Sequence, residues 1–193
     1  MKIAVVGLWH LGTVTAGCLA AAGHEVIGLD EDQALIDGLR TARLPVAEPG
    51  LAEIFEAEIA SGRLRFSSSF ADAAGADVAW IAYDTPVDDQ DRADTEFVHS
   101  RALRVLGHMT PGAVLLVSSQ MPVGSIARLE KEFGPTVHIA CSPENLRLGK
   151  AISVFRSPDR VVVGVRSPEV RAALEGVWAP FGAKVEWMSV ESA

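Results

Sequence analysis

The residues best suited to chemistry near the start of the chain are Gly7 to Gly12, which read GLWHLG and follow an apolar run. A first glycine allows a tight turn after a strand, and a second lets the next helix pack closely on that strand. Asp30 stands 18 residues after Gly12, at the end of a second apolar run. Helix N-termini bind phosphate through free amides, and an acidic residue at this position binds ribose hydroxyls. The three residues therefore predict a dinucleotide site.

The turn departs from the usual G-x-G-x-x-G pattern because Trp9 stands at the middle glycine. A Cβ atom and an indole are thereby added where backbone and phosphate are expected to approach closely. Either the indole points away and the loop shifts, or the usual ligand position is blocked. Asp30 has a second reading, as the N-cap of the following helix, which is compatible with ribose binding. Both alternatives stay open at this point.

The elements that must position these residues are short apolar runs that alternate with helix-like segments. The runs predict strands at residues 2–7, 25–30, 64–68, 77–83, 113–119, 137–142, 160–166 and 184–189. The segments between them predict helices at 11–23, 32–40, 50–60, 94–107, 123–133 and 168–178, the last with Ser167 as N-cap and Pro168 in its first turn. Such alternation is typical of parallel strands joined by crossovers. We expect an α/β fold of Rossmann type over residues 1–193: a doubly wound, mostly parallel sheet of about eight strands with helices on both faces.

Composition excludes several classes of partner. The net charge of −8 argues against nucleic acid, because phosphate contacts need a basic surface. Cys18 and Cys141 lack metal-ligand spacing, as do the five histidines, so we predict no metal site and two free thiols in a reducing compartment. Residues 3–23 are uncharged like a signal peptide or membrane span, but four glycines, Trp9 and His10 favour a buried strand and helix. We expect a cytoplasmic protein with no membrane partner.

Two later motifs are more specific than the glycine turn: PVAEPGL at residues 45–51 and SPENLRLGKAI at residues 142–152. With these motifs in this order, the chain resembles the UDP-glucose/GDP-mannose dehydrogenase family, and the resemblance extends over essentially its whole length. Further matching stretches are GHEVIGLD (23–30), GRLRF (62–66), ADVAWIA (76–82), TP (85–86), MPVG (121–124) and SPDRVVVGV (157–165).

The resemblance implies oxidation of the C6 hydroxyl of a nucleotide sugar to a carboxylate with two molecules of NAD, through a cysteine thiohemiacetal and thioester. Family members have an N-terminal NAD domain, a central helix through which they commonly form homodimers, and a C-terminal nucleotide-sugar domain. This chain is similar to the first part only, so the other two parts are expected to be absent from it. Neither Cys18 nor Cys141 matches the nucleophile, and the isolated chain is expected to be inactive.

The resemblance also implies roles for individual residues. Glu144 corresponds to the glutamate that assists water in thioester hydrolysis, a task for which a carboxylate in a partly dry cleft is suited. Without the resemblance, a carboxylate stabilised at a helix start is the favoured reading. Asn145, Leu146 and Arg147 correspond to the segment that lines the sugar pocket. The cofactor contacts implied are Gly7, His10, Leu11, Gly12, Asp30, Thr85 and Gln120.

Five residues depart from the family pattern, at positions that in the family surround NAD. They are Trp9, Leu35, Asp84, Gln120 and Leu148, where glycine, lysine, glycine, threonine and glutamate are usual. Two functions therefore stay open: the cofactor domain of an NAD-dependent nucleotide-sugar 6-dehydrogenase, or a non-catalytic nucleotide-binding or sugar-nucleotide-binding module with a weakened NAD site. A third, a dehydrogenase of the 3-hydroxyacid type, is disfavoured by the EPGL and SPENLRLG motifs.

Overall fold

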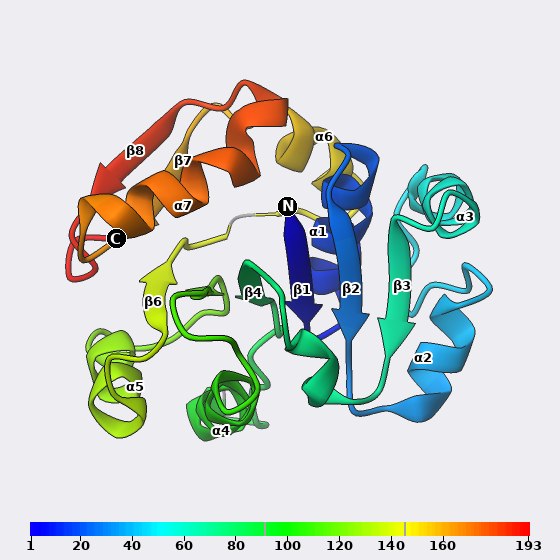
Figure 1. The fold of residues 1–193 in the computed structure, drawn as a ribbon. Helices are drawn as coiled ribbons and strands as arrows, with labels where there is room; N and C mark the ends of the chain where they lie inside the picture. The colour runs from blue at the N-terminus through cyan, green and yellow to red at the C-terminus, as the bar shows by residue number, and fades with distance from the viewer. Residues whose placement is uncertain (91, 145) are drawn as a thin grey trace.

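The computed structural model describes residues 1–90, 92–144 and 146–193. Its centre is an eight-stranded sheet in the order β3-β2-β1-β4-β5-β6-β7-β8 (Figure 1). Neighbouring strands are parallel except β6 and β7, which pair antiparallel, so the predicted mostly parallel sheet is confirmed. The strands are β1 Lys2–Val6, β2 Glu25–Leu29, β3 Leu64–Ser67, β4 Val78–Ile81, β5 Val114–Val117, β6 His138–Cys141, β7 Val161–Gly164 and β8 Val185–Met188.

Every predicted helix is present, with ends within two residues of the expected ones. These helices are α1 His10–Ala21, α2 Gln33–Leu39, α3 Leu51–Ala60, α4 Thr95–Leu106, α5 Ser125–Phe133 and α7 Pro168–Trp178. Ser167 caps α7, with Pro168 in the first turn, as expected. The sequence pattern did not predict α6 (Ala151–Arg156) or the 3-10 turns Phe70–Ala73 and Ala179–Phe181. Such short elements complete too few turns to produce a helical period in the sequence.

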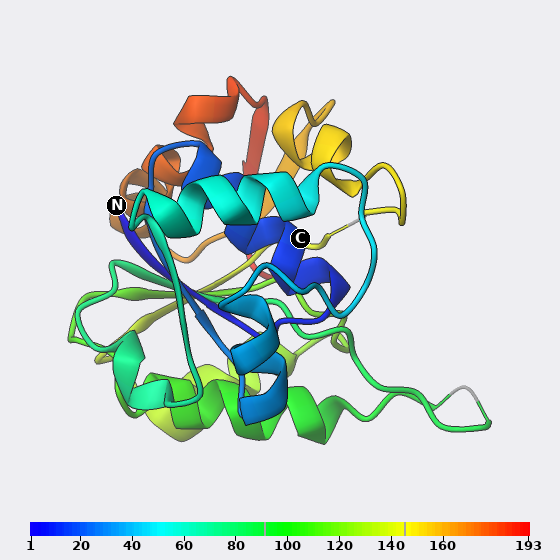
Figure 2. The ribbon, with the colours of Figure 1, turned by 90° about the vertical axis from the view of Figure 1, so that its right-hand side faces the viewer.

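Helices cover both faces of the sheet. The apolar side chains of α1, α2, α3, α6 and α7 belong to one core cluster, and those of α4 and α5 belong to another. Figure 2 shows α3 and α4 on opposite sides of the sheet, with α1 between α3 and the strands. Residues 3–23, the uncharged stretch, form most of β1 and all of α1. Among the described residues, no helix is both long and apolar enough to cross a membrane.

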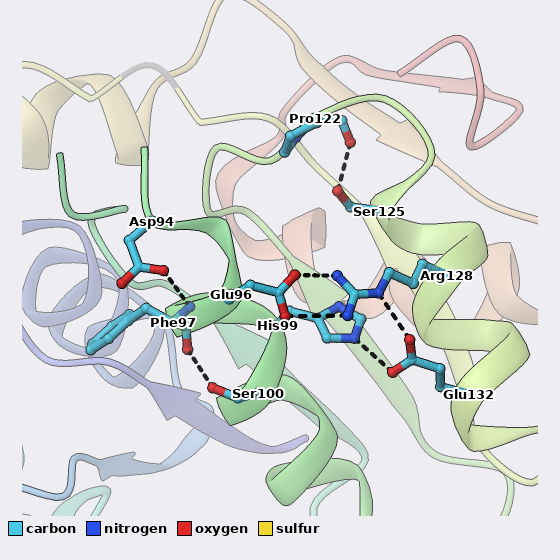
Figure 3. A network of polar contacts seen from close by, with 9 residues as sticks. All are labelled: Asp94, Glu96, Phe97, His99, Ser100, Pro122, Ser125, Arg128 and Glu132. Carbon is cyan, nitrogen blue, oxygen red and sulfur yellow. Dashed lines mark hydrogen bonds and ion pairs between the residues drawn. The ribbon is translucent and has the colours of Figure 1, made fainter. Parts of the chain in front are cut away.

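A polar network holds α4 against α5 on one face of the sheet (Figure 3). The Arg128 guanidinium pairs with Glu96 on α4 and donates to Glu132 on its own helix over 2.9 Å. Glu132 in turn lies 2.8 Å from the Nε2 atom of His99, whose side chain is almost completely buried. The pairing fixes α5 and, with it, the preceding loop that leads from β5.

Strand order creates a switch point in the middle of the sheet. The chain passes from β1 outward to β2 and β3, and then returns to place β4 on the other side of β1. Because the helices that follow β1 and β4 go to opposite faces, the carboxyl ends of these two strands diverge and leave a crevice. Ligands of doubly wound sheets bind at such a crevice, so residues 7–12 and 82–85 occupy the expected location.

Candidate functional site

The turn after β1 depends on both of its glycines. Gly7 has a φ of +90°, and a Cβ atom there would lie 2.6 Å from the ring of Tyr83. A Cβ atom on Gly12 would lie 1.7 Å from the carbonyl oxygen of Gly7, so the first turn of α1 packs directly on the loop. Any larger residue at Gly12 must displace backbone. The local geometry therefore fits the predicted close approach of strand, turn and helix.

Asp30 lies at the end of β2 and fixes the same turn. Its Oδ2 atom accepts a hydrogen bond from the Leu8 amide over 2.9 Å, and its Oδ1 atom accepts one from the Asp32 amide over 3.1 Å. The N-cap of α2 is Asp32, whose carboxylate accepts from the amides of Ala34 and Leu35. The alternative reading of Asp30 as a helix cap is therefore wrong, because the helix begins two residues later than that reading requires.

A cleft of about 990 Å³ opens at this point, at the upper end of the range for ligand sites. Asp30 lines it at the end of β2, and Trp9, with 53 % of its surface exposed, lines it beside the first turn of α1. Leu35 and Asp84, two further departures from the family pattern, are on the same walls. The other lining residues are Leu8, Glu31, Asp32, Ala34, Gly38, Arg43, Leu44, Pro45, Tyr83, Thr85, Pro86, Val87, Phe97 and Arg101.

A second space of about 220 Å³ shares the wall formed by Tyr83, Asp84 and Thr85. It brings together segments that are far apart in the sequence: the start of α1, the end of β4, and the loops after β5 and β6. The other lining residues are His10, Leu11, Ser118, Gln120, Glu144 and Leu146. Seven of the residues singled out from the sequence, Asp84 included, therefore surround one small space that adjoins the larger cleft, a shape suited to an elongated two-part ligand.

Hydrogen bonds fix the strand ends that form this second space. The Thr85 hydroxyl donates to the Gln120 carbonyl oxygen over 2.8 Å and so ties the loop after β4 to the loop after β5. Beneath them the Trp80 indole donates to Ser118 Oγ, which donates to the Ser142 carbonyl oxygen, both over 2.7 Å. The loop that carries Glu144 therefore begins from a fixed position.

Glu48, from the PVAEPGL motif, connects three segments of the site. Its side chain is 1 % exposed, and its carboxylate accepts from the amides of Gly149 over 2.8 Å and Ala151 over 2.9 Å. One of its oxygens also lies 3.1 Å from Nε2 of His10. Burial would raise the pKa of Glu48, but these hydrogen bonds outweigh it and the pKa is lowered. The motif was recognised from the sequence but the role of this residue was not; the available signal was an acidic residue between two prolines.

The remaining residues of the loop after β6 are less closely associated with the two spaces. Glu144 is half-buried in the loop, and α6 begins only at Ala151, so the alternative of a carboxylate at a helix start is wrong. Arg147 is exposed and Leu148 is 66 % exposed, and both lie outside the two spaces. Asn145 lies outside the described residues.

Neither cysteine is suited to act as a nucleophile. Cys18 is fully buried in α1, and burial raises the pKa of its thiol to about 12. Cys141 ends β6, where burial also raises the pKa of its thiol. The thiolate is the reactive form, and a raised pKa leaves little of it at neutral pH.

Comparison with known proteins identifies the protein family to which this fold and its cleft belong. Residues 1–182 match the model of the NAD binding domain of the UDP-glucose/GDP-mannose dehydrogenase family. The chain belongs to this family. NAD is the cofactor that this domain of the family binds, and the expected resemblance is confirmed.

Curated relatives and solved structures agree with this assignment. The chain is 36 % identical over 179 residues to a UDP-glucose 6-dehydrogenase of Rhizobium meliloti, which covers 89 % of this chain and 41 % of the relative. It is 32 % identical over 193 residues to one of Pseudomonas aeruginosa, with 94 % and 42 % covered. A UDP-glucose dehydrogenase of Pyrobaculum islandicum superposes with a TM-score of 0.90 at 31 % identity, over 99 % of this chain and 46 % of that one. The chain therefore spans less than half the length of these relatives.

A structure of lower sequence identity shares the fold alone. A 3-hydroxyisobutyrate dehydrogenase of Mycobacterium tuberculosis is 19 % identical with a TM-score of 0.64, over 98 % of this chain and 54 % of that one. At that identity the similarity concerns the fold only. Within the cleft, the family's cofactor fits the close-packed glycines, the first turn of α1, which has no side-chain cap from Trp9, and Asp30 at the end of β2. Trp9, Leu35 and Asp84 are the residues on its walls that do not follow the usual pattern.

Proposed function

We propose that residues 1–193 form the cofactor domain of an NAD-dependent nucleotide-sugar 6-dehydrogenase, which oxidises the C6 hydroxyl of a UDP-glucose-type substrate to a carboxylate. The observation that carries the proposal is the shared wall of Tyr83, Asp84 and Thr85, which joins the large cleft to the space lined by Glu144. An elongated cofactor in the cleft would thus extend toward a carboxylate able to handle protons. When bound, NAD supplies the acceptor for hydride.

The cofactor contacts follow from the positions of the side chains. The Asp30 carboxylate would hold the adenosine ribose hydroxyls while it keeps its bond to the Leu8 amide. The amides at His10 and Leu11, in the first turn of α1, would face the pyrophosphate, because a helix N-terminus favours anions. Thr85 and Gln120, already tied to each other, would contact the far half of the cofactor.

Glu144 is the residue that we propose for proton handling. It lies in the smaller space with His10, Thr85 and Gln120, in a half-buried setting where a carboxylate can orient or deprotonate water. Leu146 lines the same space. Together with Asn145 and Arg147 it would line the nucleotide-sugar pocket, as the similarity to the family implies. The cysteine nucleophile would have to come from outside residues 1–193, because burial raises the pKa of both Cys18 and Cys141.

Calorimetric titration of NAD tests the cofactor site. We expect the native chain to bind with a dissociation constant between micromolar and sub-millimolar, and Asp30→Asn to weaken binding by about tenfold, since one charge-assisted bond to the ribose is lost. Asp37→Asn on the exposed side of α2 is the matched control and should bind like the native chain. Equal affinity of Asp30→Asn and the native chain would contradict the proposed role of Asp30.

A turnover assay tests whether residues 1–193 are sufficient for the oxidation. The 193-residue chain should bind NAD without producing NADH from UDP-glucose, because it spans less than half the length of the relatives named for this oxidation. Neither cysteine, moreover, supplies the thiolate that the second oxidation needs. Absorbance at the NADH band is the measurement. Steady formation of NADH by the purified chain would show that the reaction needs no further residues.

Trp9 and Asp84 favour a second function, that of a non-catalytic nucleotide-binding or sugar-nucleotide-binding module with a weakened NAD site. Both line the cleft where the family usually has glycine. A Trp9→Gly variant separates the two functions. Failure of the native chain to bind NAD, together with binding by Trp9→Gly, would favour the module; binding by both would favour the dehydrogenase domain.

A further inference from the structure

Asp84, in the loop after β4, brings a carboxylate to the N-terminus of α1. Its Oδ2 atom lies 3.5 Å from the amide nitrogen of Leu11, across 73 residues of sequence. The N-cap residue of α1 is Trp9, which makes no side-chain hydrogen bond to the amides of the first turn. The amides of this first turn therefore have an anion beside them already, supplied by the protein.

The carboxylate is oriented toward the ligand space. Asp84 lines both the large cleft and the smaller space, and its side chain is exposed to them. Nearby protein atoms partly remove the carboxyl from water and raise its pKa, while hydrogen bonds from the amides of Leu11, His10 and Asp84 itself, and the nearby His10 side chain, oppose this effect.

The backbone next to Asp84 is held in place, whereas the Asp84 side chain is exposed at the wall of the cleft. Thr85 next to it is tied to the Gln120 carbonyl oxygen over 2.8 Å. The Asp84 bond to Leu11 is long, whereas the Asp30 bond to Leu8 in the same turn is 2.9 Å. A rotation about the side chain of Asp84 would therefore release the helix terminus without movement of the strand ends.

We propose that Asp84 is an internal competitor for the pyrophosphate position, so that a dinucleotide binds by displacing this carboxylate from the first turn of α1. The inference rests on the proposed cofactor site and adds a determinant of its affinity. An anion at the helix terminus satisfies the same amides that the pyrophosphate needs, and two like charges a few ångströms apart repel even in a partly hydrated cleft. The residue therefore weakens the binding of ligands that carry phosphate and leaves ligands without phosphate unaffected.

Three ligands and four chains test the proposal by calorimetry. NAD, ADP and adenosine are titrated into the native chain, Asp84→Asn, Asp84→Gly and the control Asp89→Asn, which changes an exposed acid of the following loop outside both spaces. We expect both Asp84 variants to bind NAD and ADP about tenfold more tightly than the native chain. Adenosine should bind all four chains equally, and Asp89→Asn should behave like the native chain. The glycine variant keeps the test valid if the asparagine amide interferes with folding.

Each alternative result has one meaning. Equal affinity of the native chain and both Asp84 variants for NAD and ADP overturns this inference and leaves the proposed function intact. Tighter binding of adenosine by the same factor also overturns it, because the effect would then not concern phosphate. Absence of NAD, ADP and adenosine binding in all four chains, the Asp84 variants included, overturns the proposed function together with this inference.

Discussion

The Glu48 carboxylate lies 3.1 Å from the Nε2 atom of His10, in a position where the Glu48 side chain is 1 % exposed. His10 begins α1, and the same carboxylate also holds the amides of Gly149 and Ala151 at the end of the loop that carries Glu144. The residue thus connects the phosphate turn with the candidate substrate loop. A buried carboxylate is costly unless it is hydrogen-bonded, and these three partners give each of its oxygens at least one bond.

Glu48→Gln should lower the free energy of unfolding by about 1–3 kcal/mol, because an amide can accept from only part of the partners that the carboxylate satisfies. Urea unfolding followed by circular dichroism measures the loss. The control is Glu56→Gln, an exposed glutamate on α3, which should change stability by no more than about 0.5 kcal/mol. If the two variants are equally stable, the connection made by Glu48 does not contribute to folding.

The contribution of Glu48 should depend on pH. Burial would raise its pKa, but the hydrogen bonds from His10, Gly149 and Ala151 lower it below the usual value. A carboxyl with a lower pKa when folded stabilises the fold above its unfolded pKa of about 4.3, and this stabilisation is lost as the pH falls through the folded pKa. The difference in unfolding free energy between the native chain and Glu48→Gln should therefore stay level from about pH 6 to pH 5 and shrink below about pH 4. If this difference in unfolding free energy stays constant down to the lowest pH at which the chain is folded, the prediction is wrong.

Gly12→Ala should destabilise the chain by about 3 kcal/mol or more, since the new Cβ atom would lie 1.7 Å from the Gly7 carbonyl oxygen and backbone would have to move. Gly107→Ala is the control: Gly107 caps α4 with an ordinary helical φ of −62°, and the nearest atom to a Cβ there is 3.4 Å away. Thermal unfolding of the two variants measures the contrast. A similar small shift in both melting temperatures would mean that α1 does not pack on the turn as described.

Trp9 should report cofactor binding by its fluorescence. It is 53 % exposed and lines the cleft, whereas Trp80 and Trp178 are buried and Trp187 is half-buried on β8, away from the cleft. Titration with NAD should change the emission of the native chain and of a Trp187→Phe variant. A Trp9→Phe variant should lose most of that change. If Trp9→Phe keeps the full signal, the indole does not lie beside the bound dinucleotide.

Much of the architecture could be predicted from local patterns in the sequence. Apolar β-branched runs and helical segments alternate over the whole chain, and each predicted strand and helix is present. The turn at Gly7 and Gly12, and the position of Asp30 at the end of β2, followed from spacing alone. These features are local: each depends on residues within a single βαβ unit, so the order of residue types specifies them without knowledge of distant neighbours.

Tertiary structure decided the features that depend on contacts between distant segments. Only the folded chain shows that Asp32, and not Asp30, caps α2, because that depends on where the helix begins. Glu48 finds its amide partners at Gly149 and Ala151, about a hundred residues later in the chain. Asp84 approaches Leu11 across 73 residues because the strand order returns β4 to the side of β1. Sequence spacing carries no information about which loops meet at the ends of a sheet. The packing of the helices on the two faces of the sheet decides which loops meet. The proposed role of Asp84 depends on this arrangement, because it brings the carboxylate to the start of α1.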